Sequence, residues 1–599
     1  MDKANQSQKQ KSKAKQSKAK NKTKTKSQNQ KPKSKPNCSV PCVILTKKKK
    51  KKSIFEKVSF AESKSDLCSC FSFDFHSRVM SSSSSSSSLP PTPLLVGSAV
   101  TGTLSLVAFL VYRHFTTKNY FARVDPKIPR VPGSEGLLGF VPMMKNDDIY
   151  KTFNGFLEDY GSPCVTHLFG GLIFAMGTPE QARDVLTAQA SREKGIGGYD
   201  TLLGLLGKDS LLTLPYNTWV PLRKTISGVF HVKFMKEYFS VFVSSSRDLV
   251  EKIEELSGTR VRYHEAAQAA GMKTEATTAL RAIDIDHLTM NFALDVVTKA
   301  LFSEDMNIQK GNNPEIITKL TRLVHLFLEV VRNPLFPVLH PFKNMEYHRL
   351  IRWFHGLSLK FIEARKKDPS IQKSDLLSLM LATTNPDTGK LLTTAEILSQ
   401  CTTFYFAGHD TTGHTLAWAL YEISRCPEAE ERIHEELAAV LGDDDFPTLE
   451  QANRLTYIQW VVKETLRMHP PVGTVTRRLE TESTVGGITI PAGSEIYLNI
   501  LSVHNSEKTW PEPWKFRPER FSDQESEGRH PYAWMPFSTG ERNCVGMNFA
   551  LLELRTALAA VCKKFLVRPS MVEQPHSRAF ITSIPADGIY LSFIKRDSS

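Results

Sequence analysis

The amino-acid sequence predicts a mainly α-helical fold with a small β portion, and three observations carry that prediction. From about residue 147 to the end, apolar residues recur chiefly three or four positions apart, which is the spacing of one helix face. Alternating, strand-like patterns interrupt it at 165–176 and 484–500, the second with the turn residues Gly486, Gly487 and Pro491. No internal repeat occurs, so we expect 147–599 to form one large domain.

Segments with the helical pattern follow one another along this domain. The longest, 394–425, is long for a globular helix, and an apolar run at 545–562 closes the series. In chain order the predicted helices are 150–160, 179–186, 219–229, 241–256, 285–301, 314–331, 347–367, 394–425, 450–468 and 545–562. We therefore expect a helical body broken by two short β regions.

The first 79 residues differ in composition from the rest of the chain. They carry 22 Lys and Arg against 5 Asp and Glu, a net of +17, whereas the whole 599-residue chain has a net charge of +15. The remainder is therefore close to neutral, and we expect no nucleic-acid-binding fold. Residues 1–52 contain almost nothing apolar, which predicts disorder. Three interpretations of 1–79 stay open: a nucleic-acid tail, a tail for anionic lipid, or sequence upstream of a start at Met80.

A membrane anchor is predicted at 94–113, after a Ser- and Pro-rich segment at 80–93. Residues 94–112 carry no charge over 19 positions, which as a helix span about 28 Å against a bilayer core of about 30 Å. Four basic residues follow between 113 and 127, so the positive-inside rule leaves the C-terminal domain in the cytosol. A cleaved signal or transit peptide is the alternative. Residues 114–146 then form a linker.

The cysteines predict no disulfide framework. Four of the nine lie in the basic tail, namely Cys38, Cys42, Cys68 and Cys70. Cys68 and Cys70 are too close together for a zinc-finger pair, and Cys38 and Cys42 lack a matching His or Cys pair downstream. The other five cysteines are scattered singly. We therefore expect the domain to lie in a reducing compartment.

The most informative stretch is 536–550, which reads PFSTGERNCVGMNFA. Cys544 stands there before a helical run, with Gly540 and Gly546 close by. A thiolate that binds iron must be partly buried and still keep its charge, and backbone N–H groups of a tight turn and of a helix start stabilise it. The glycines let the backbone approach a flat ligand, and Arg542 can reach a carboxylate on it. The alternative is an inert core cysteine.

The pattern F-x-x-G-x-R-x-C-x-G is complete at Phe537, Gly540, Arg542, Cys544 and Gly546. It resembles the heme-thiolate loop of the cytochrome P450 family of the eukaryotic microsomal type. The resemblance extends from about residue 128 to the C-terminus and implies the cytochrome P450 fold. It also implies heme b as the cofactor, with Cys544 as ligand of the iron and Phe537, Arg542 and Gly546 around it.

The same resemblance bears on the N-terminal region. The Pro- and Gly-rich stretch 128–142 is similar to the hinge that joins the family's membrane anchor to its catalytic domain. With the anchor at 94–113, the resemblance implies a single-pass protein of the endoplasmic reticulum membrane with a cytosolic catalytic domain. The Ser-rich, acid-poor start keeps a plastid membrane as the alternative.

The middle of the long helix 394–425 reads AGHDTTG. Gly408 and two threonines are poor choices for a helix interior, and threonine hydroxyls compete for backbone carbonyls, so we expect the helix to open locally. The segment resembles the family's oxygen-activation motif, in which Asp410 and Thr411 are the acid and alcohol that deliver protons. His409 is interpreted as a surface or core residue rather than a ligand.

Glu464 and Arg467 lie three residues apart on one face of a predicted helix. Such a pair is usually solvated and weak. Here the helix is apolar around the pair, and the sequence FRPERF follows with Arg520. This resembles the family's E-x-x-R helix, whose pair meets the arginine of the P-E-R-F segment. The implied role of the three residues is to brace the cysteine loop.

Three further residues are candidates for binding the heme carboxylates. Trp219 and Arg223 lie four residues apart on one helix, so the indole N–H and the guanidinium can donate to one propionate. Arg477 resembles another propionate-binding arginine of the family. The alternative for the arginines is an ordinary surface position.

The expectation of a separate redox partner follows from motifs that the sequence lacks. Neither G-x-G-x-x-G after a strand nor G-x-x-x-x-G-K-[ST] occurs, so electrons must come from another protein. We expect an NADPH-dependent flavoprotein reductase, with cytochrome b5 or ferredoxin as alternatives. The basic residues expected at its docking surface are Arg223, Lys224, Lys563 and Lys564.

The resemblance implies a monooxygenase that inserts one oxygen atom of O2 into a lipophilic small molecule. Residues near 197–212 and after Pro471, such as Val472 and Val475, are expected to shape the substrate pocket. Two alternatives stay open: an O2-independent heme-thiolate isomerase or dehydratase, and a non-catalytic heme sensor. The substrate itself does not follow from the sequence.

Overall fold

The computed structural model describes most of the chain after residue 120. The described residues are 121–136, 139–144, 148–168, 171–195, 199, 202–257, 281–333, 335–368, 375–385, 388–570, 574–579 and 582–596. The predicted tail 1–79, the segment 80–93 and the anchor 94–113 lie outside these residues. Within the described ranges, no helix combines the length and apolar character needed to cross a bilayer.

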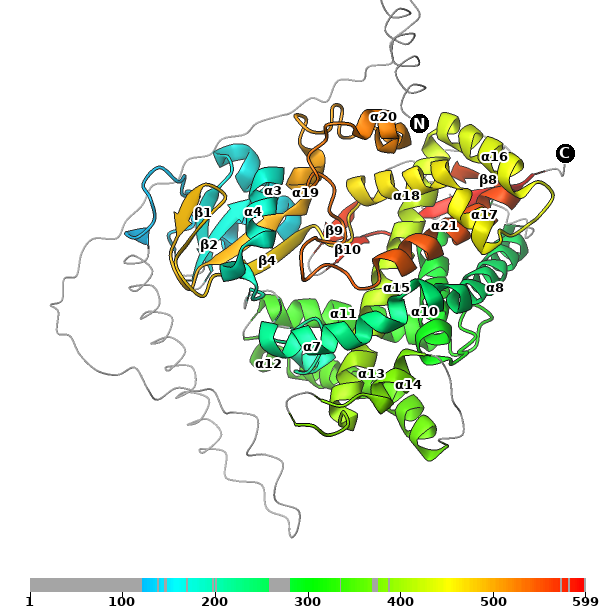
Figure 1. Cartoon of the computed structure of the whole chain (residues 1–599), viewed down its shortest axis with the longest axis horizontal. Coiled ribbons are helices and arrows are strands. Elements are labelled where there is room, and N and C mark those ends of the chain that lie inside the picture. The colour runs from blue at the N-terminus through cyan, green and yellow to red at the C-terminus, as the bar shows by residue number, and fades with distance from the viewer. Residues whose placement is uncertain are drawn as a thin grey trace, which may run out of the picture. The chain divides into compact units, whose positions relative to one another are not determined.

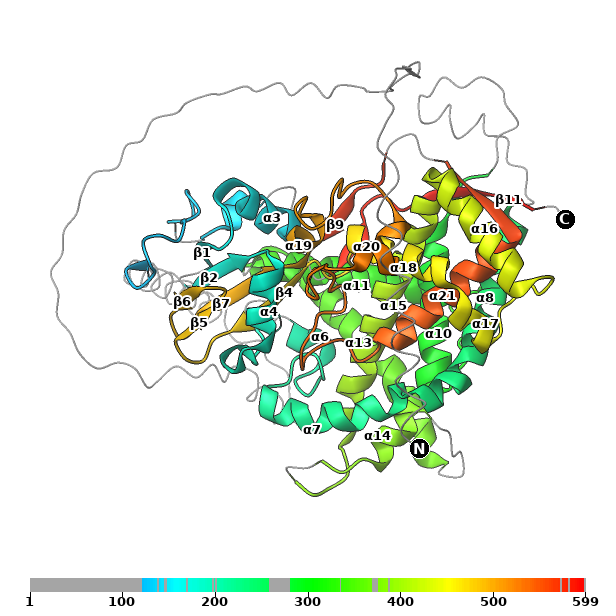
Figure 2. The same cartoon turned by 45° about the horizontal axis from the view of Figure 1, so that its top comes forward.

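Helix α15 (Thr394–Arg425) is the central element of the helical part. It begins at a capping box, in which the Thr393 and Glu396 side chains each accept a hydrogen bond from the other residue's backbone N–H. Helix α10 (Ile285–Phe302) packs along it, and α18 (Thr456–Met468) and α21 (Met547–Lys564) also contact it. Figures 1 and 2 both show α10, α15 and α21 side by side.

The remaining helices cover this centre and the sheets. They are α3 (Ile149–Tyr160), α4 (Pro179–Thr187), α6 (Leu203–Leu206), α7 (Tyr216–Ser227), α8 (Val232–Ser257), α11 (Glu315–Arg332), α12 (Phe336–Leu339), α13 (Pro341–Lys367), α14 (Leu376–Ala382), α16 (Pro427–Leu441), α17 (Leu449–Arg454), α19 (Ile500–Asn505) and α20 (Asp523–Ser526). Short 3-10 turns occur at Val141–Met143, Gln189–Ser191, Gly228–Phe230 and Pro518–Phe521.

The largest sheet has four strands in the order β1-β2-β7-β4. Its strands are β1 (Cys164–Leu168), β2 (Gly171–Met176), β4 (Thr474–Arg478) and β7 (Glu495–Asn499), with β2 parallel to β7 and the other pairs antiparallel. Figure 1 shows this sheet with α3, α4 and α19 on one side of the molecule, while α8, α16, α17 and α21 lie on the other.

Three smaller sheets complete the β portion. One is the hairpin β5 (Ser483–Val485) and β6 (Ile488–Ile490), whose turn contains Gly486 and Gly487, both with positive φ. The others are β3 (Ile283–Asp284) with β8 (Phe565–Pro569) and β11 (Tyr590–Lys595), and β9 (Ser577–Ala579) with β10 (Ser583–Pro585).

The prediction of a mainly helical fold with a small β portion is confirmed, and most predicted helices agree within a few residues. One helix was predicted wrongly: 450–468 is not continuous but consists of α17 and α18, separated at Leu455. The Glu436 carboxylate accepts hydrogen bonds from Tyr457 N at 2.7 Å and Ile458 N at 3.0 Å, so a side chain from α16 caps the start of α18.

The expected opening of the long helix is also wrong. Helix α15 is continuous from Thr394 to Arg425. Its two central glycines have a different explanation, because a Cβ would lie 2.5 Å from Val297 Cγ2 at Gly408 and 2.7 Å from Met290 Sδ at Gly413. Both contacts belong to α10, so the glycines allow the two helices to approach closely.

Candidate active site

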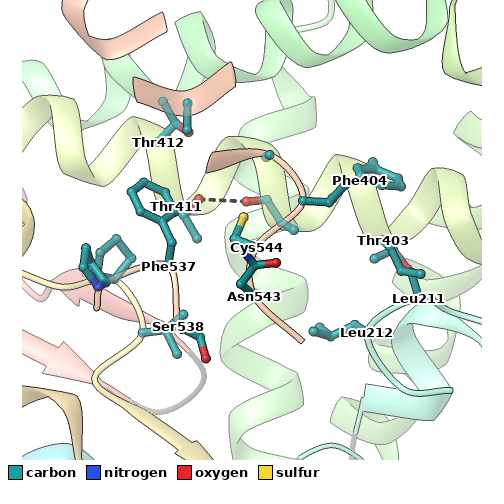
Figure 3. A pocket seen from close by; sticks show the side chains of 18 of the residues that line it. Leu211, Leu212, Thr403, Phe404, Thr411, Thr412, Phe537, Ser538, Asn543 and Cys544 are labelled. Carbon is teal, nitrogen blue, oxygen red and sulfur yellow. Dashed lines mark hydrogen bonds between the residues drawn. The ribbon is translucent and has the colours of Figure 1, made fainter. Parts of the chain in front are cut away.

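A cavity of about 300 Å³ lies between α15 and the loop that precedes α21. Figure 3 shows Thr403, Phe404, Thr411 and Thr412 of α15 and Phe537, Ser538, Asn543 and Cys544 of the loop around the same space. The apolar lining residues include Tyr199, Leu211, Leu212, Val297, Leu301, Phe404, Val472, Val475, Phe537 and Phe549. The stretches 197–212 and 471–475, expected to shape the pocket, therefore both reach this cavity.

Cys544 is held at the cavity wall by its own loop. Its backbone N–H donates to the Phe537 carbonyl at 2.9 Å, and its accessible side chain opens into the cavity. Burial raises the pKa of the Cys544 thiol, while a hydrogen bond from the Gly546 backbone N–H and the charge of Arg223 oppose that rise. One N–H and one guanidinium thus favour the thiolate, but burial outweighs them and the pKa of Cys544 stays above its usual value.

The two glycines of the loop act differently from what the sequence suggested. Gly540 has a φ of +74°, and a Cβ there would lie 2.5 Å from the Leu186 carbonyl oxygen, so the turn and the contact with the protein require it. Gly546 lines the cavity, and a Cβ there would lie 4.0 Å from Cys544 Sγ. Of the two glycines, therefore, only Gly546 borders the cavity beside the sulfur.

The predicted carboxylate-binding residues all line the cavity. Arg542 Nη1 and Nη2 donate to the Leu214 carbonyl at 3.0 and 3.1 Å, and its guanidinium lies 4.4 Å from the Trp219 ring. Arg223 Nη2 donates to Asn543 Oδ1 at 2.9 Å, and Arg477 Nη1 to its neighbour's carbonyl at 2.9 Å. Hence Trp219, Arg223, Arg477 and Arg542 come together from three different parts of the chain.

Lys194 is a fourth cation at this cavity and was not predicted. Its Nζ donates to the Leu212 carbonyl at 2.7 Å and lies 4.3 Å from the Tyr199 ring. Burial, followed by the charges of Arg542, Arg477 and Arg223, lowers the pKa of Lys194 well below its usual value. No motif marks Lys194 in the sequence, and lysines usually lie on the surface, so only the fold reveals it.

The cations around the cavity have little negative charge to balance them. Arg542 Nη2 lies 3.6 Å from Glu193 Oε2, and among the described residues its Nε has no hydrogen-bond partner. Burial lowers the pKa of Arg542 to about 10. Among the described residues that line the cavity, the carboxyl group is that of Glu553, whose pKa burial raises well above its usual value, which favours its neutral form. The site therefore suits an anionic ligand.

These features fit a heme. The porphyrin plane is apolar and matches the apolar walls, its two carboxylates match the surplus of cations, and its iron matches the single thiolate of Cys544. Among the described residues no group of three or more His, Cys, Asp and Glu side chains forms an alternative metal site.

Asp410 and Thr411, the two residues predicted to deliver protons, lie across the cavity from the cysteine loop. Of the two, only Thr411 reaches the cavity itself. Thr411 lines the cavity, and its hydroxyl donates to the Ala407 carbonyl at 2.8 Å (Figure 3). Asp410 is buried behind this wall, with Oδ1 3.7 Å from His414 Nε2. His409 is a core residue, with Nδ1 2.6 Å from the Tyr405 carbonyl. His414 and Thr582 also interact with Asp410, and no motif in the sequence marks either residue.

The three residues predicted to brace the loop form a buried network. Arg467 Nε and Nη2 bind Glu464 Oε2 and Oε1 at 2.7 and 2.8 Å, and Arg520 Nε binds Oε1 at 3.2 Å. Arg467 also donates to the carbonyls of His504 and Pro513 at 2.9 and 2.7 Å. His504 Nε2 then accepts from Met535 N at 3.0 Å, which links the network to the segment that leads into the cysteine loop.

A mainly helical fold in which one loop cysteine faces an apolar, cation-rimmed cavity is the arrangement of heme-thiolate proteins. The family description "Cytochrome P450" matches residues 129–592, so the chain belongs to the cytochrome P450 family. As a member, it is in general a heme-containing monooxygenase of the oxidoreductase class that works with a redox partner, O2 and lipophilic substrates.

Similar proteins support the same assignment over almost their full lengths. Cytochrome P450 4c21 of Blattella germanica is 28% identical over 78% of this chain and 93% of its own. Cytochrome P450 4V2 of Pongo abelii is 26% identical over 84% of this chain and 97% of its own. Cytochrome P450 4Z1 of Homo sapiens is 26% identical over 82% and 95%, respectively.

Proposed function

We propose that this chain is a membrane-anchored monooxygenase with heme b as its cofactor. It inserts one oxygen atom of O2 into a lipophilic small molecule with electrons from a separate NADPH-dependent flavoprotein reductase. The observation that supports this most directly is the position of Cys544, whose side chain opens into a cavity rimmed by Lys194, Arg223, Arg477 and Arg542.

In this proposal the residues at the cavity rim bind the cofactor. The four cations hold its carboxylates, and Cys544 is the iron ligand, whose thiolate form is favoured by Gly546 N–H and Arg223. Bound heme supplies a redox-active iron that activates O2. Phe537 belongs to the same loop, lines the cavity and accepts the Cys544 N–H at its carbonyl.

The α15 side of the cavity manages protons. Thr411 presents its hydroxyl at the wall, and Asp410 stands behind it as the acid that carries protons inward. The surrounding wall is apolar, with Val297, Leu301 and Phe404, so few water molecules compete with this delivery. A lipophilic substrate fits the same surfaces.

Two other functions use a heme-thiolate site. An O2-independent isomerase or dehydratase needs no proton delivery, so the Thr411 hydroxyl at the wall with Asp410 behind it favours the monooxygenase. A heme sensor binds a gas and turns nothing over. An assay with the redox partner distinguishes the monooxygenase from the other two functions, because only the monooxygenase consumes NADPH and O2 together.

Fewer of the four basic residues predicted to dock the reductase remain as candidates once their contacts are known. Arg223 points into the cavity, Lys564 Nζ pairs with Glu254 Oε2 at 2.6 Å, and Lys563 Nζ donates to the Gly442 carbonyl. Lys224 is exposed on α7. Of the four residues, it is the one that we propose contacts an acidic flavoprotein. Cytochrome b5 or ferredoxin are alternative donors.

For location we propose the endoplasmic reticulum membrane, with one span at 94–113 and the catalytic domain in the cytosol. The support is the composition of that segment and the basic residues after it. A plastid membrane is the alternative, and a fluorescent fusion of the full chain distinguishes the two.

The function is tested with purified protein and a flavoprotein reductase. A panel of fatty acids, sterols, terpenoids and aromatic xenobiotics is screened for spin-state shifts of the heme, and each ligand that shifts the spectrum is incubated with NADPH and ¹⁸O₂. We expect one labelled oxygen atom in the product of at least one ligand. Product formed without NADPH or without label would contradict a monooxygenase, and gas binding without turnover would indicate a sensor.

A further inference from the structure

A buried chain of charged side chains joins α10 to α15 behind the cavity wall. Asp286 Oδ1 lies 2.7 Å from His414 Nδ1, and His414 Nε2 lies 3.7 Å from Asp410 Oδ1. The side chains of Asp286, His414 and Asp410 are 15%, 8% and 6% exposed. We propose that His414 is a positioning residue that holds the Asp410 carboxylate ionised and oriented, and that Asp286 holds His414. This rests on the proposed function, in which Asp410 carries protons to the cavity.

The packing of the two helices places the imidazole between the two carboxylates. At Gly413, next to His414, a Cβ would lie 2.7 Å from Met290 Sδ and 3.1 Å from the Thr289 carbonyl. The helices therefore approach closely at this point, and a side chain from α15 reaches the first turn of α10. Asp286 lies in that turn, where the helix dipole favours a negative charge.

The charges around the histidine keep it protonated. Two carboxylates face it, Asp286 from α10 and Asp410 from its own helix. Burial alone lowers the pKa of His414, yet these two carboxylates raise it to about 10. At neutral pH the side chain is therefore an imidazolium with both ring nitrogens donating.

The His414 imidazolium in turn determines whether the Asp410 carboxyl group is ionised. Burial raises the pKa of Asp410, but the hydrogen bond and charge of His414, with smaller contributions from His409 and Thr582, bring it below its usual value. Tyr150, whose pKa is raised chiefly by burial and to a small extent by the Asp410 charge, is a further titratable group near it. A proton that reaches Asp410 is thus weakly held and readily released.

The second carboxylate oxygen of Asp410, Oδ2, indicates the route by which the proton leaves. Oδ1 is on the His414 side, and among the described residues Oδ2 has no hydrogen-bond partner of ordinary length. Thr582, whose hydroxyl helps to lower the pKa of Asp410, lines the cavity. A proton on Oδ2 can pass to an acceptor at this wall while the carboxylate re-forms beside His414. Thr582 is then the link between a buried acid and the cavity.

Asp286→Asn tests the inference without changing α15. The substitution keeps the size of a side chain that is 15% exposed and removes one of the two charges that keep His414 protonated. The share of NADPH-derived electrons released as H2O2 is measured with reductase and lauric acid as the lipophilic probe, from about pH 6 to about pH 9. We expect a flat profile for the wild type and, for Asp286→Asn, a rise with pH of up to about tenfold.

The matched control is His287→Gln, one residue further along α10 and exposed. It should follow the wild-type profile. An independent measurement without turnover is the melting temperature between about pH 7 and about pH 10. Because the pKa of His414 is raised, its contribution to stability is complete below about 6.5 and is lost as pH rises through about 10. The wild type should therefore lose more stability over this range than Asp286→Asn.

A double-mutant cycle separates positioning from a merely structural role. His414→Gln should raise H2O2 release in the wild-type background and have no further effect in Asp410→Asn. Equal effects in both backgrounds, or coincident pH profiles for the wild type and Asp286→Asn, would overturn the inference. All variants are first checked by the spectrum of the reduced carbon monoxide complex. Normal thiolate spectra with unchanged profiles reject the role of His414 alone, whereas a wild type without that spectrum rejects the proposed function.

Discussion

This protein has two buried clusters of charged side chains. They differ in whether a carboxylate of the protein itself binds the buried cations at short distance. In the network of Glu464, Arg467 and Arg520, one carboxylate binds both guanidinium groups at 2.7 to 3.2 Å, and backbone carbonyls take up other donors. At the cavity rim, Arg542 lies 3.6 Å from the Glu193 carboxylate, whereas the partners of Lys194, Arg223 and Arg477 among the described residues are carbonyl, amide and phenol oxygens.

The difference distinguishes charges that stabilise the fold from charges that bind a ligand. A buried ion pair with complete hydrogen bonding is destabilised chiefly when one partner is removed. A buried cation without a nearby counter-charge is already unfavourable, as the lowered pKa of Lys194 indicates. The anion that binds such a cation must therefore belong to a ligand. The apoprotein should tolerate removal of the cation.

The largest effect is expected for Glu464→Gln. It leaves the guanidinium groups of Arg467 and Arg520 buried without a carboxylate, which typically costs about 3–5 kcal/mol. The free energy of unfolding of the apoprotein, measured with urea, should fall by that amount, and heme should be lost as well. Unchanged stability of the apoprotein would show that this network does not support the fold.

Arg542→Gln should have the opposite profile. The unfolding free energy of the apoprotein should stay within about 1 kcal/mol, because no ion pair of short distance is lost. Hemin binding should weaken by about 1.5–3 kcal/mol, roughly ten- to hundredfold, because one charge-assisted hydrogen bond to a carboxylate is removed. Hemin titration followed by absorbance measures this. An unchanged affinity would remove Arg542 from the cofactor site.

Lys194 makes hemin binding depend on pH. The pKa of Lys194 is lowered in the apoprotein, and an anionic carboxylate beside it would raise that pKa, so binding takes up a proton. Affinity should therefore fall as pH rises, by at most about 1.4 kcal/mol per pH unit. In Lys194→Met this slope should disappear, while the apoprotein becomes more stable at neutral pH. A slope that persists in the variant would contradict the prediction.

The smallest effect is expected for Glu254→Gln, the exposed counterpart of the first substitution. Glu254 also binds two cations, Lys564 at 2.6 Å and Lys595 at 2.7 Å, but all three side chains are accessible to solvent. Exposed pairs of this kind contribute about 0–1 kcal/mol. Urea unfolding should detect a change of that size or none, and a loss as large as for Glu464→Gln would show that burial is not what separates the two clusters.

Much of the fold and the core of the site follow from contiguous sequence. Cys544, Arg542 and Gly546 lie within one short motif, and Glu464 and Arg467 within one helical turn, so spacing alone brings them together. The helix boundaries of α15 could be predicted because Thr393 and Glu396 form a capping box at its start.

What could not be predicted depends on contacts between distant segments. Lys194 is a cavity residue because of the fold around it, and no neighbour in sequence indicates this. Gly408 and the two threonines suggested an opened helix, yet Gly408 and Gly413 accommodate Val297 and Met290 of α10. The role of Asp410 likewise changes once His414 is seen beside Asp286, a residue more than a hundred positions away.

The most direct measurement is the difference spectrum of the reduced protein with carbon monoxide, compared among the wild type, Cys544→Ser and Cys562→Ser. Cys562 is the matched control, because it is a buried cysteine on α21 that does not line the cavity. We predict the red-shifted Soret band of a thiolate-ligated heme for the wild type and Cys562→Ser, and its loss in Cys544→Ser. A wild type without this band after hemin supplementation, or a Cys544→Ser variant that retains it, would contradict the assignment of Cys544 as the iron ligand.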